Sequence, residues 1–337
     1  MNTQDEIQIK SETLNSVLSK MLGESILHSE YKTKQLQGGT LGDVRLVTGT
    51  AETTDGKIMP YHIVLKKQKK WERYSDPNSW QREYDLYISN FGKLFTGKLR
   101  LPECYHTEIN GDEIQIWIEY IEGATGLSLT GEMYERAAKE LGRFQGSLYA
   151  DQSPILQTLT NLSTVDYMKN LYLHYRSWNE VYDYIRSTDC PIPKHLCDML
   201  IDIDKHADEI FNRIEKLPIV LCHRDFWVTN IFSHDDKILL IDWDTAGWGY
   251  MGEDIASFIA DESDVDHMVE YYHRCVRAYY KGFSEYADIS QSSDSCIYEM
   301  ILLKFGYRLV EDYKFTESSH DKIQFLTILQ KIYEMKK

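Results

Sequence analysis

The sequence predicts an α+β protein of two lobes, the first built mainly of five strands and the second mostly helical. Up to residue 120, short runs of alternating apolar and polar residues are separated by Gly-bearing turns, as in half-buried strands. From residue 121 onward, apolar residues recur at helical spacing. A chain of 337 residues is also long enough for two lobes. We therefore expect an N-terminal lobe over residues 1–120 and a C-terminal lobe over residues 121–337.

The first lobe should begin with a helix over residues 11–22, where Leu14, Val17 and Leu18 have helical spacing. Strands are expected over residues 31–37, 43–48, 61–66, 103–107 and 113–120. Between the third and fourth strands, Ser79 is a candidate N-cap for a helix through residue 90.

The second lobe should contain helices over residues 131–149, 165–185, 193–215, 265–283 and 293–310. One short β segment interrupts them, with strands expected at 219–222, 231–233 and 237–242. This order of elements is typical of an α+β arrangement.

Composition narrows the function classes. The net charge is −16, and most of the acidic excess lies after residue 150, which disfavours nucleic-acid binding because phosphate contacts need a basic face. The acidic half could attract a cationic ligand or could simply keep the surface soluble.

No apolar run approaches the length of a membrane span, and the first twenty residues lack a signal-peptide pattern. A cytoplasmic location is the expectation, with no membrane partner. The six cysteines have no metal-ligand spacing and should be reduced thiols.

The strongest motif lies in the β segment of the second lobe. Leu221–Asn230 reads LCHRDFWVTN, and Asp242 follows in Ile241-Asp242-Trp243-Asp244. His-Arg-Asp-x-x-x-x-Asn matches the kinase catalytic loop in identity and spacing. Phosphoryl transfer needs one carboxylate to orient the acceptor hydroxyl, and a carboxylate and an amide oxygen to hold Mg²⁺ on the phosphates. The alternative is that these Asp and Asn residues only form turns, but four matching positions between apolar strands favour chemistry.

With these motifs the chain resembles the aminoglycoside phosphotransferase and choline kinase group, which are kinase-fold kinases of small molecules. The resemblance covers residues 30–310. It implies a two-lobed protein-kinase-like fold with a five-stranded antiparallel N-lobe, ATP and Mg²⁺ as cofactors, and a small-molecule acceptor. It also implies that Asp225 is the catalytic base, that His223 braces the loop, and that Asn230 and Asp242 bind Mg²⁺. Arg224 stands where the family commonly has a small residue, often Gly.

The first lobe offers matching nucleotide-binding parts. Gly38, Gly39, Thr40 and Gly42 lie between two expected strands, where the resemblance implies a loop over the phosphates. Glycines there let backbone N–H groups approach a phosphate, although Gly-Gly is also a common hairpin turn.

The resemblance further implies a phosphate-contacting lysine that closes the third strand. This selects Lys66, with Lys67 as the alternative, because neighbouring residues of a strand point to opposite faces. Glu83 would pair with the lysine. Two solvated lysines are the alternative reading.

Residues 117–123 resemble the hinge between kinase lobes. Backbone groups around Glu119 and Ile121 would bind adenine, with Tyr120 nearby. An ordinary edge strand and turn is the alternative. In the second lobe, Asp254 is expected to be structural, pairing with a basic group or loop N–H near a helix N-terminus. Gln145 occupies a position where His is frequent in the family.

Two rival functions remain. A protein kinase is disfavoured because Asp242-Trp243-Asp244 replaces Asp-Phe-Gly and no Ala-Pro-Glu follows. A pseudokinase-like binding protein is disfavoured because the lysine, Glu, Asp, Asn and Asp positions are all retained. The acceptor is left open between aminoglycosides, choline, amino sugars and other polyols, with an amine-bearing, cationic molecule favoured by the acidic second half.

Overall fold

The computed structural model describes residues 7–36, 42–73, 76–261, 264–289 and 294–336, and it divides into two compact units. The first unit comprises the described residues up to 92 together with 101–122 and 159–161, and the second comprises 93–100, 123–158 and the described residues from 162. The first is a sheet with helices and the second is mostly helical, so the predicted α+β class is confirmed.

The first unit contains one five-stranded antiparallel sheet of strand order β1-β2-β3-β6-β5. Its strands are β1 (Ile26–Gln35), β2 (Gly42–Thr53), β3 (Ile58–Lys69), β5 (Cys104–Asn110) and β6 (Glu113–Glu119), and its helices are α1 (Ser11–Leu22) and α2 (Ser79–Ile88).

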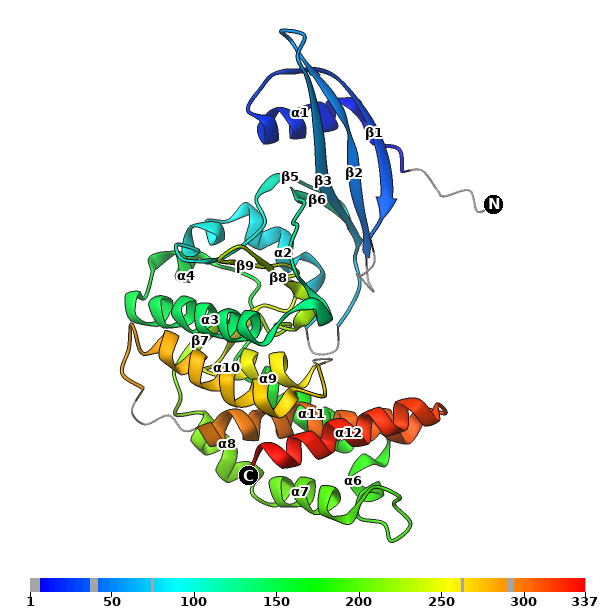
Figure 1. Ribbon diagram of the computed structural model, residues 1–337, viewed down its shortest axis with the longest axis vertical. Coiled ribbons are helices and arrows are strands. Elements are labelled where there is room, and N and C mark those ends of the chain that lie inside the picture. Colours follow the sequence, from blue (N-terminus) through cyan, green and yellow to red (C-terminus); the bar gives the residue numbers. More distant parts are fainter. Residues whose placement is uncertain (1–6, 37–41, 74–75, 262–263, 290–293, 337) are drawn as a thin grey trace. The chain divides into compact units, whose positions relative to one another are not determined.

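The two helices pack with different side chains of the sheet. Leu14 and Val17 of α1 belong to a buried cluster with Ile63 and Leu65 of β3, and α1 accordingly lies along the sheet in Figure 1. The neighbouring β3 residue Val64 instead joins the cluster that contains Trp80 of α2. Because side chains alternate along a strand, this places every second residue of β3 on the α2 side.

The observed bounds correct several expectations for this unit. The first three strands extend beyond the predicted ranges by several residues each. The N-cap position of α2 is Asn78 rather than Ser79, and it makes no side-chain capping hydrogen bond. Ser79 is instead the first helical residue and is fully buried.

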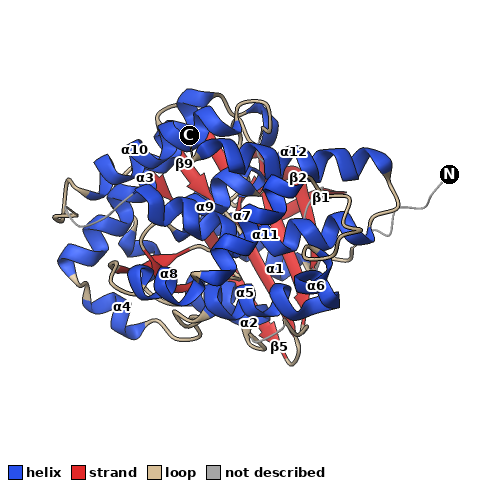
Figure 2. Cartoon of the chain, turned by 90° about the horizontal axis from the view of Figure 1, so that it is seen from below, coloured by secondary structure: helices blue, strands red, loops and turns tan. Residues whose placement is uncertain are grey.

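The second unit is dominated by helices, as the view in Figure 2 shows. They are α3 (Gly131–Asp151), α4 (Pro154–Thr158), α5 (Tyr167–Ser177), α6 (Val181–Tyr184), α7 (Lys194–Lys205), α8 (Ala207–Ile214), α9 (Glu253–Ala260), α10 (Met268–Phe283), α11 (Asp294–Phe315) and α12 (Ser319–Met335). Short 3-10 turns include η2 (Gly126–Ser128), η3 (Trp178–Glu180) and η4 (Val228–Asn230), and η1 (Phe91–Leu94) joins the two units.

Two small sheets interrupt these helices. β7 (Ile219–Cys222) pairs antiparallel with β10 (Gly247–Tyr250). β9 (Lys237–Leu240) pairs antiparallel with β8 (Ile231–His234) and parallel with β4 (Leu99–Arg100). The segment between β7 and β8 carries the predicted catalytic loop, so both sheets anchor it.

Helices α3 and α10 pack closely and lie side by side in Figure 1. A Cβ on Gly142 of α3 would lie 2.2 Å from the Tyr279 carbonyl oxygen, and a Cβ on Gly282 of α10 would lie 2.2 Å from that of Lys139. Real Cβ atoms do not approach backbone oxygen this closely, so glycine at both positions permits the contact. Helix α3 also packs against β7, where Gln145 donates to the Leu221 carbonyl (3.0 Å).

The helix predicted over 165–185 is broken. Asn179 and Glu180 have φ of 47° and 59°, which is left-handed backbone that ends α5 and starts α6 in a new direction. The helix predicted over 193–215 is likewise divided into α7 and α8 at His206. Strand β10 and helix α12 were not anticipated.

Across the residues described, no helix is both long and apolar enough to cross a membrane. All six cysteines are free thiols.

Candidate active site

The segment after β7 forms a tight loop with many internal hydrogen bonds. The Asp225 carbonyl accepts from the Trp227 amide (3.0 Å), and the Trp227 carbonyl accepts from the Asn230 amide (3.1 Å). The Ile241 amide then donates to the Asn230 carbonyl (3.0 Å), which joins the loop to the end of the β8–β9 hairpin. This arrangement fixes Asp225 and Asn230 on one loop beside Asp242.

Asp225 and Asn230 are in direct contact. The Asn230 Nδ2 donates to the Asp225 carboxylate Oδ2 (2.8 Å) and to the Asp225 carbonyl (3.0 Å). Because the amide nitrogen is used in this way, the Asn230 Oδ1 is left as the oxygen that could bind a cation. Asn230 is buried and Asp225 is half-buried.

The two Asp side chains influence each other. Burial, with the nearby negative charge of Asp242 second, raises the pKa of Asp225 to about 6. Asp242 itself has φ of 66°, a left-handed backbone that ends the strand before it and turns the chain. The neighbouring carboxylates of Asp225 and Asp242 create a negative potential that favours the binding of a cation.

His223 is buried and holds the loop with both ring nitrogens. Its Nε2 lies 2.9 Å from the Ile241 carbonyl oxygen, and its Nδ1 lies 3.2 Å from the Asp225 amide nitrogen. Nε2 must therefore carry the hydrogen while Nδ1 accepts, so the neutral ring suits this position. Burial lowers the pKa of His223 to about 4. The ring also makes an edge contact with Trp243, at 4.5 Å between centroids.

Arg224 adopts left-handed backbone with φ of 69°. This conformation is the one that glycine adopts without cost. Here the guanidinium is fully buried and forms an ion pair with Glu253 (3.2 Å). It also donates to the Ser163 hydroxyl and to the Thr164 carbonyl (2.7 Å). These contacts offset the backbone strain.

Asp254 is buried at the first turn of α9 and binds the predicted catalytic loop. Its Oδ2 accepts from the His223 amide (2.9 Å), and its Oδ1 accepts from the Arg224 amide (2.7 Å). The expected pairing with loop N–H groups is thus observed. Gln145 of α3 donates to the same carboxylate (3.0 Å) and accepts from the Tyr279 hydroxyl (2.6 Å). Gln145 therefore links the loop to the α3–α10 pair.

One buried side chain near the loop was missed by the sequence reading. Lys304 of α11 is 7% exposed, and its ammonium donates to the Arg224 carbonyl (3.1 Å). A lysine inside the apolar run 301–305 was the signal that could have identified it.

In the first unit, Lys66 forms an ion pair with Glu83 of α2. Lys66 lies on the α2 side of β3, two residues after Val64, whereas Lys67 points the other way and has Asp43 and Glu113 near it. Burial lowers the pKa of Lys67. Arg82 anchors α2 beside Glu83, since its buried guanidinium bonds to Asp76 at 2.6 and 2.8 Å.

The other expected nucleotide contacts are only partly described. Gly38, Gly39 and Thr40 lie outside the described residues. Gly42 starts β2, and a Cβ there would lie 2.9 Å from the Lys67 carbonyl oxygen. The Glu119 amide donates to the Glu103 carbonyl (2.8 Å), so this end of β6 is held by β-sheet pairing.

Tyr120 and Ile121 follow directly after β6. The Tyr120 ring makes an edge contact with His62, at 5.3 Å between centroids.

The donor set fits Mg²⁺ better than a transition metal. Asp242 and Asn230 offer a carboxylate and an amide oxygen, which are hard ligands. Within the described ranges, no group of three or more His, Cys, Asp or Glu side chains is placed to hold a metal ion by itself. Such a site suits a cation that takes its remaining ligands from phosphates and water.

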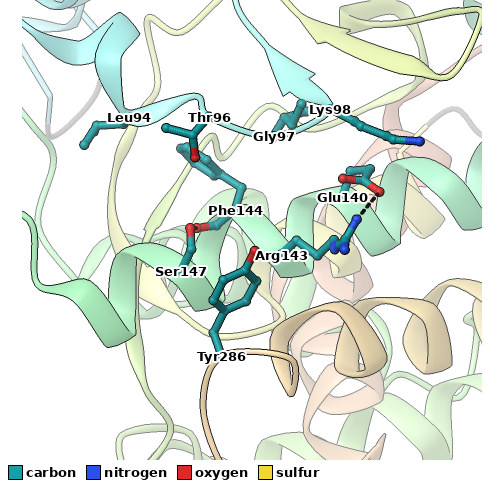
Figure 3. Close-up of a pocket in the computed structure, with 10 residues that line it drawn as sticks. Leu94, Thr96, Gly97, Lys98, Glu140, Arg143, Phe144, Ser147 and Tyr286 are labelled. Carbon is teal, nitrogen blue, oxygen red and sulfur yellow. Dashed lines mark hydrogen bonds and ion pairs between the residues drawn. The ribbon is translucent and has the colours of Figure 1, made fainter.

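A separate hollow of about 170 Å³ lies between residues 94–99 and helix α3 in the second unit. Figure 3 shows the Arg143 and Glu140 side chains turned toward each other, with an ion pair of 3.3 Å between them. Arg143 is also paired with Glu285 (2.7 Å). None of the predicted site residues line this hollow, so it does not indicate a different location for the active site.

The sequence model of the phosphotransferase enzyme family matches residues 64–289. This span includes Lys66, the predicted catalytic loop and Asp254. The chain therefore belongs to that family and is a small-molecule kinase that acts on a hydroxyl group. No curated protein sequence matches it.

Solved structures with the same fold are distant in sequence. A choline kinase from Cryptosporidium parvum Iowa II is 14% identical, with 90% of each chain covered and a TM-score of 0.55. A spectinomycin phosphotransferase in complex with ADP and spectinomycin is 15% identical, with 98% of this chain and 99% of the other covered and a TM-score of 0.52.

An amicoumacin kinase in complex with AMP-PNP and Ca²⁺ is 13% identical, with 97% of this chain and 94% of the other covered and a TM-score of 0.54. These likenesses confirm the kinase-like fold.

Proposed function

We propose that the chain transfers the γ-phosphoryl group of Mg²⁺-ATP to a hydroxyl group of a small, amine-bearing acceptor. The observation that carries the proposal is the contact between Asp225 and Asn230 on one fixed loop, with the charge of Asp242 near enough to raise the pKa of Asp225. The solved relatives that contain ADP, or AMP-PNP with Ca²⁺, support a nucleotide and a divalent cation as ligands.

Asp225 is proposed as the base. A pKa of about 6 makes its carboxylate a stronger proton acceptor than an ordinary Asp, yet leaves it mostly ionised at neutral pH. It would orient the acceptor hydroxyl and take its proton as the new P–O bond forms. His223 stays neutral and holds the Asp225 amide, so its role is to brace the loop.

Asn230 Oδ1 and the Asp242 carboxylate are proposed to hold Mg²⁺, which when bound would neutralise charge on the phosphates. Lys66, oriented by Glu83, is proposed to contact the α- and β-phosphates. Backbone groups of Gly38, Gly39, Thr40 and Gly42 would cover the phosphates.

Adenine would bind the backbone of Glu119 and Ile121 beside Tyr120. Because transfer needs the base, the cation and the lysine at once, each is expected to be essential.

An amine-bearing acceptor is favoured by acidic side chains near the loop. The charge of Asp261 contributes to the raised pKa of Asp225, which indicates that the two groups are close. Arg308 lies 3.4 Å from Asp261 and 4.0 Å from Asp312, so these three groups together carry one net negative charge. Burial raises the pKa of Asp312. An ammonium group would meet net attraction here.

Other acidic residues close to Asp261 or Asp312 in the chain are engaged elsewhere or lie outside the described part. Asp264 bonds to His267 (2.7 Å), and Glu311 accepts from Asn179 (3.1 Å). Glu262 is not among the described residues. Asp261 is therefore the residue to test.

The acceptor can be identified by measuring ADP release with a panel of aminoglycosides, choline, amino alcohols, amino sugars and neutral sugars. We expect an amine-bearing compound to have the highest kcat/KM, and its KM to rise with salt more than that of a neutral analogue. Asp261→Asn should raise the same KM, whereas Asp264→Asn should not. A neutral or anionic compound as best acceptor, with no salt dependence, would contradict the proposed charge.

Two alternatives are separated by the same assay. A choline or amino-sugar kinase would differ only in which acceptor gives the highest rate of ADP release. A pseudokinase-like binding protein would bind ATP without releasing ADP, and Asp225→Ala would then change nothing.

A further inference from the structure

Lys304 is a buried cation in helix α11, and the residues on either side of it in the sequence are apolar. It is 7% exposed, and its neighbours Leu303 and Phe305 are buried as well. Burial of an ammonium is costly unless it makes strong hydrogen bonds. Helices α9 and α11 lie side by side in Figure 1, and Lys304 extends from α11 between α9 and the catalytic loop.

Both hydrogen bonds of the ammonium go to neutral oxygens. One goes to the carbonyl of Arg224 (3.1 Å) and the other to the hydroxyl of Ser257 in α9. The charge of Lys304 acts against the rise in pKa of Asp225 and of Asp254, but its hydrogen bonds go elsewhere. Here the ammonium instead joins the body of α9 to the peptide group that directly precedes Asp225.

The peptide groups of Arg224 are held from both sides. Its N–H donates to the Asp254 carboxylate (2.7 Å), and its C=O accepts from the Lys304 ammonium. The residue has left-handed backbone with φ of 69°, a conformation that a non-glycine residue keeps only when its surroundings impose it. Two buried side chains of opposite charge thus fix the orientation of the peptide bond from which Asp225 extends.

We propose that Lys304 is a positioning residue for phosphoryl transfer, acting through the Arg224 carbonyl to hold the Asp225 carboxylate in its productive orientation. The proposal rests on the proposed role of Asp225 as the base. It assigns Lys304 no contact with nucleotide, metal or acceptor. Its loss should therefore lower turnover without weakening substrate binding.

The test uses Lys304→Met, which removes the donor, and Lys304→Gln, which keeps a weaker neutral donor. Arg213→Met is the matched control. Arg213 of α8 is half-exposed and pairs with Glu299 of α11 at 2.5 Å, so this variant also removes a polar contact of α11 but leaves the catalytic loop untouched.

Two readouts are measured for each variant: kcat and KM for Mg²⁺-ATP with the best acceptor, and hydrogen exchange of the amides of residues 223–230. Lys304→Met should lower kcat by about tenfold or more with KM changed by less than about threefold, and Lys304→Gln should lower kcat by about threefold to tenfold. Exchange in the loop should be faster in both variants. Arg213→Met should match the wild type in both readouts.

Wild-type kcat and wild-type loop exchange in Lys304→Met would overturn the proposal, as would a rise in KM that accounts for the whole loss of activity. If Lys304→Met does not fold, Lys304→Gln decides by the same criteria. If the wild-type chain transfers no phosphate to any acceptor, the proposed function fails, while loop exchange still tests whether Lys304 holds the loop.

Discussion

Removal of the Lys66 ammonium should reveal how much the ion pair between Lys66 and Glu83 contributes to the stability of the first unit. The side chains of Lys66 and Glu83 are 16% and 3% exposed. Lys66→Ala would leave the Glu83 carboxylate buried without its cation, and breaking a buried pair in this way costs about 3–5 kcal/mol. Because Lys66 is partly exposed, water can enter the vacated space. We therefore expect the unfolding free energy to fall by about 3 kcal/mol, near the lower end of that range.

Two variants make this prediction specific. Lys67→Ala removes a neighbouring lysine that points to the other side of β3, and it should cost no more than about 0.5 kcal/mol. Lys66→Ala combined with Glu83→Gln removes the uncompensated charge and should recover about 1–2 kcal/mol of the loss.

The free energy of opening can be measured for the first unit alone by hydrogen exchange of the β3 amides under native conditions. The KM for Mg²⁺-ATP should be measured alongside it, and it should rise at least about tenfold in Lys66→Ala but little in Lys67→Ala. Equal effects of the two lysine variants on both quantities would refute the argument from strand alternation. A larger effect of Lys67→Ala would make Lys67 the phosphate ligand.

Three further predictions concern the catalytic loop. Asp242→Ala should raise the Mg²⁺ concentration needed for half-maximal activity more than Asn230→Ala does, because it removes a charged ligand; an unchanged Mg²⁺ titration would contradict the metal assignment. His223 has a pKa of about 4 in the folded chain and about 6.5 when unfolded, so its contribution to stability is lost as pH falls from 7 to 4. Relative to His223→Gln, the wild type should lose about 3 kcal/mol of unfolding free energy over this range, and parallel stability curves would show that the ring is not held neutral. Arg224→Gly should relieve about 1 kcal/mol of backbone strain but leave Glu253 buried without its cation at a cost of about 3–5 kcal/mol; a variant at least as stable as the wild type in urea unfolding would contradict this balance.

Short-range patterns were sufficient to predict most of the first unit. Alternation located all five strands of the sheet, because each strand has one face against a helix. The ends of the strands were less accurate. β2 and β3 continue well past the predicted ranges as a long antiparallel pair, and their outer residues are stabilised by pairing rather than by an apolar pattern.

The second unit shows where local patterns fail. The break at Asn179 and Glu180 depends on left-handed backbone at two non-glycine residues, which no spacing of apolar residues indicates. Strand β10 reads Gly-Trp-Gly-Tyr and resembles a turn, yet pairing with β7 makes it a strand. Tertiary contact decides such short elements.

The motif residues of the loop could be proposed from the sequence because phosphoryl transfer requires their chemistry at fixed spacing. Their supporting residues were harder to predict. Asp254 and Gln145 were noticed as positions, but the hydrogen bond between them joins α3 to α9 and is visible only in the fold. Lys304 lies 79 residues beyond Asp225 in the chain, and only its burial and its bond to the Arg224 carbonyl reveal its connection to the loop.

The most direct test of the central claim is the formation of a phosphate monoester on the acceptor. The wild-type chain, Mg²⁺-ATP and the best acceptor are incubated, and the product is followed by ³¹P NMR and mass spectrometry. Asp225→Asn is measured in parallel, together with its affinity for Mg²⁺-ATP. We expect the wild type to yield a phosphorylated hydroxyl, and Asp225→Asn to bind the nucleotide while losing turnover by about 10²–10⁴-fold. Turnover of Asp225→Asn within a few-fold of the wild type would contradict the account.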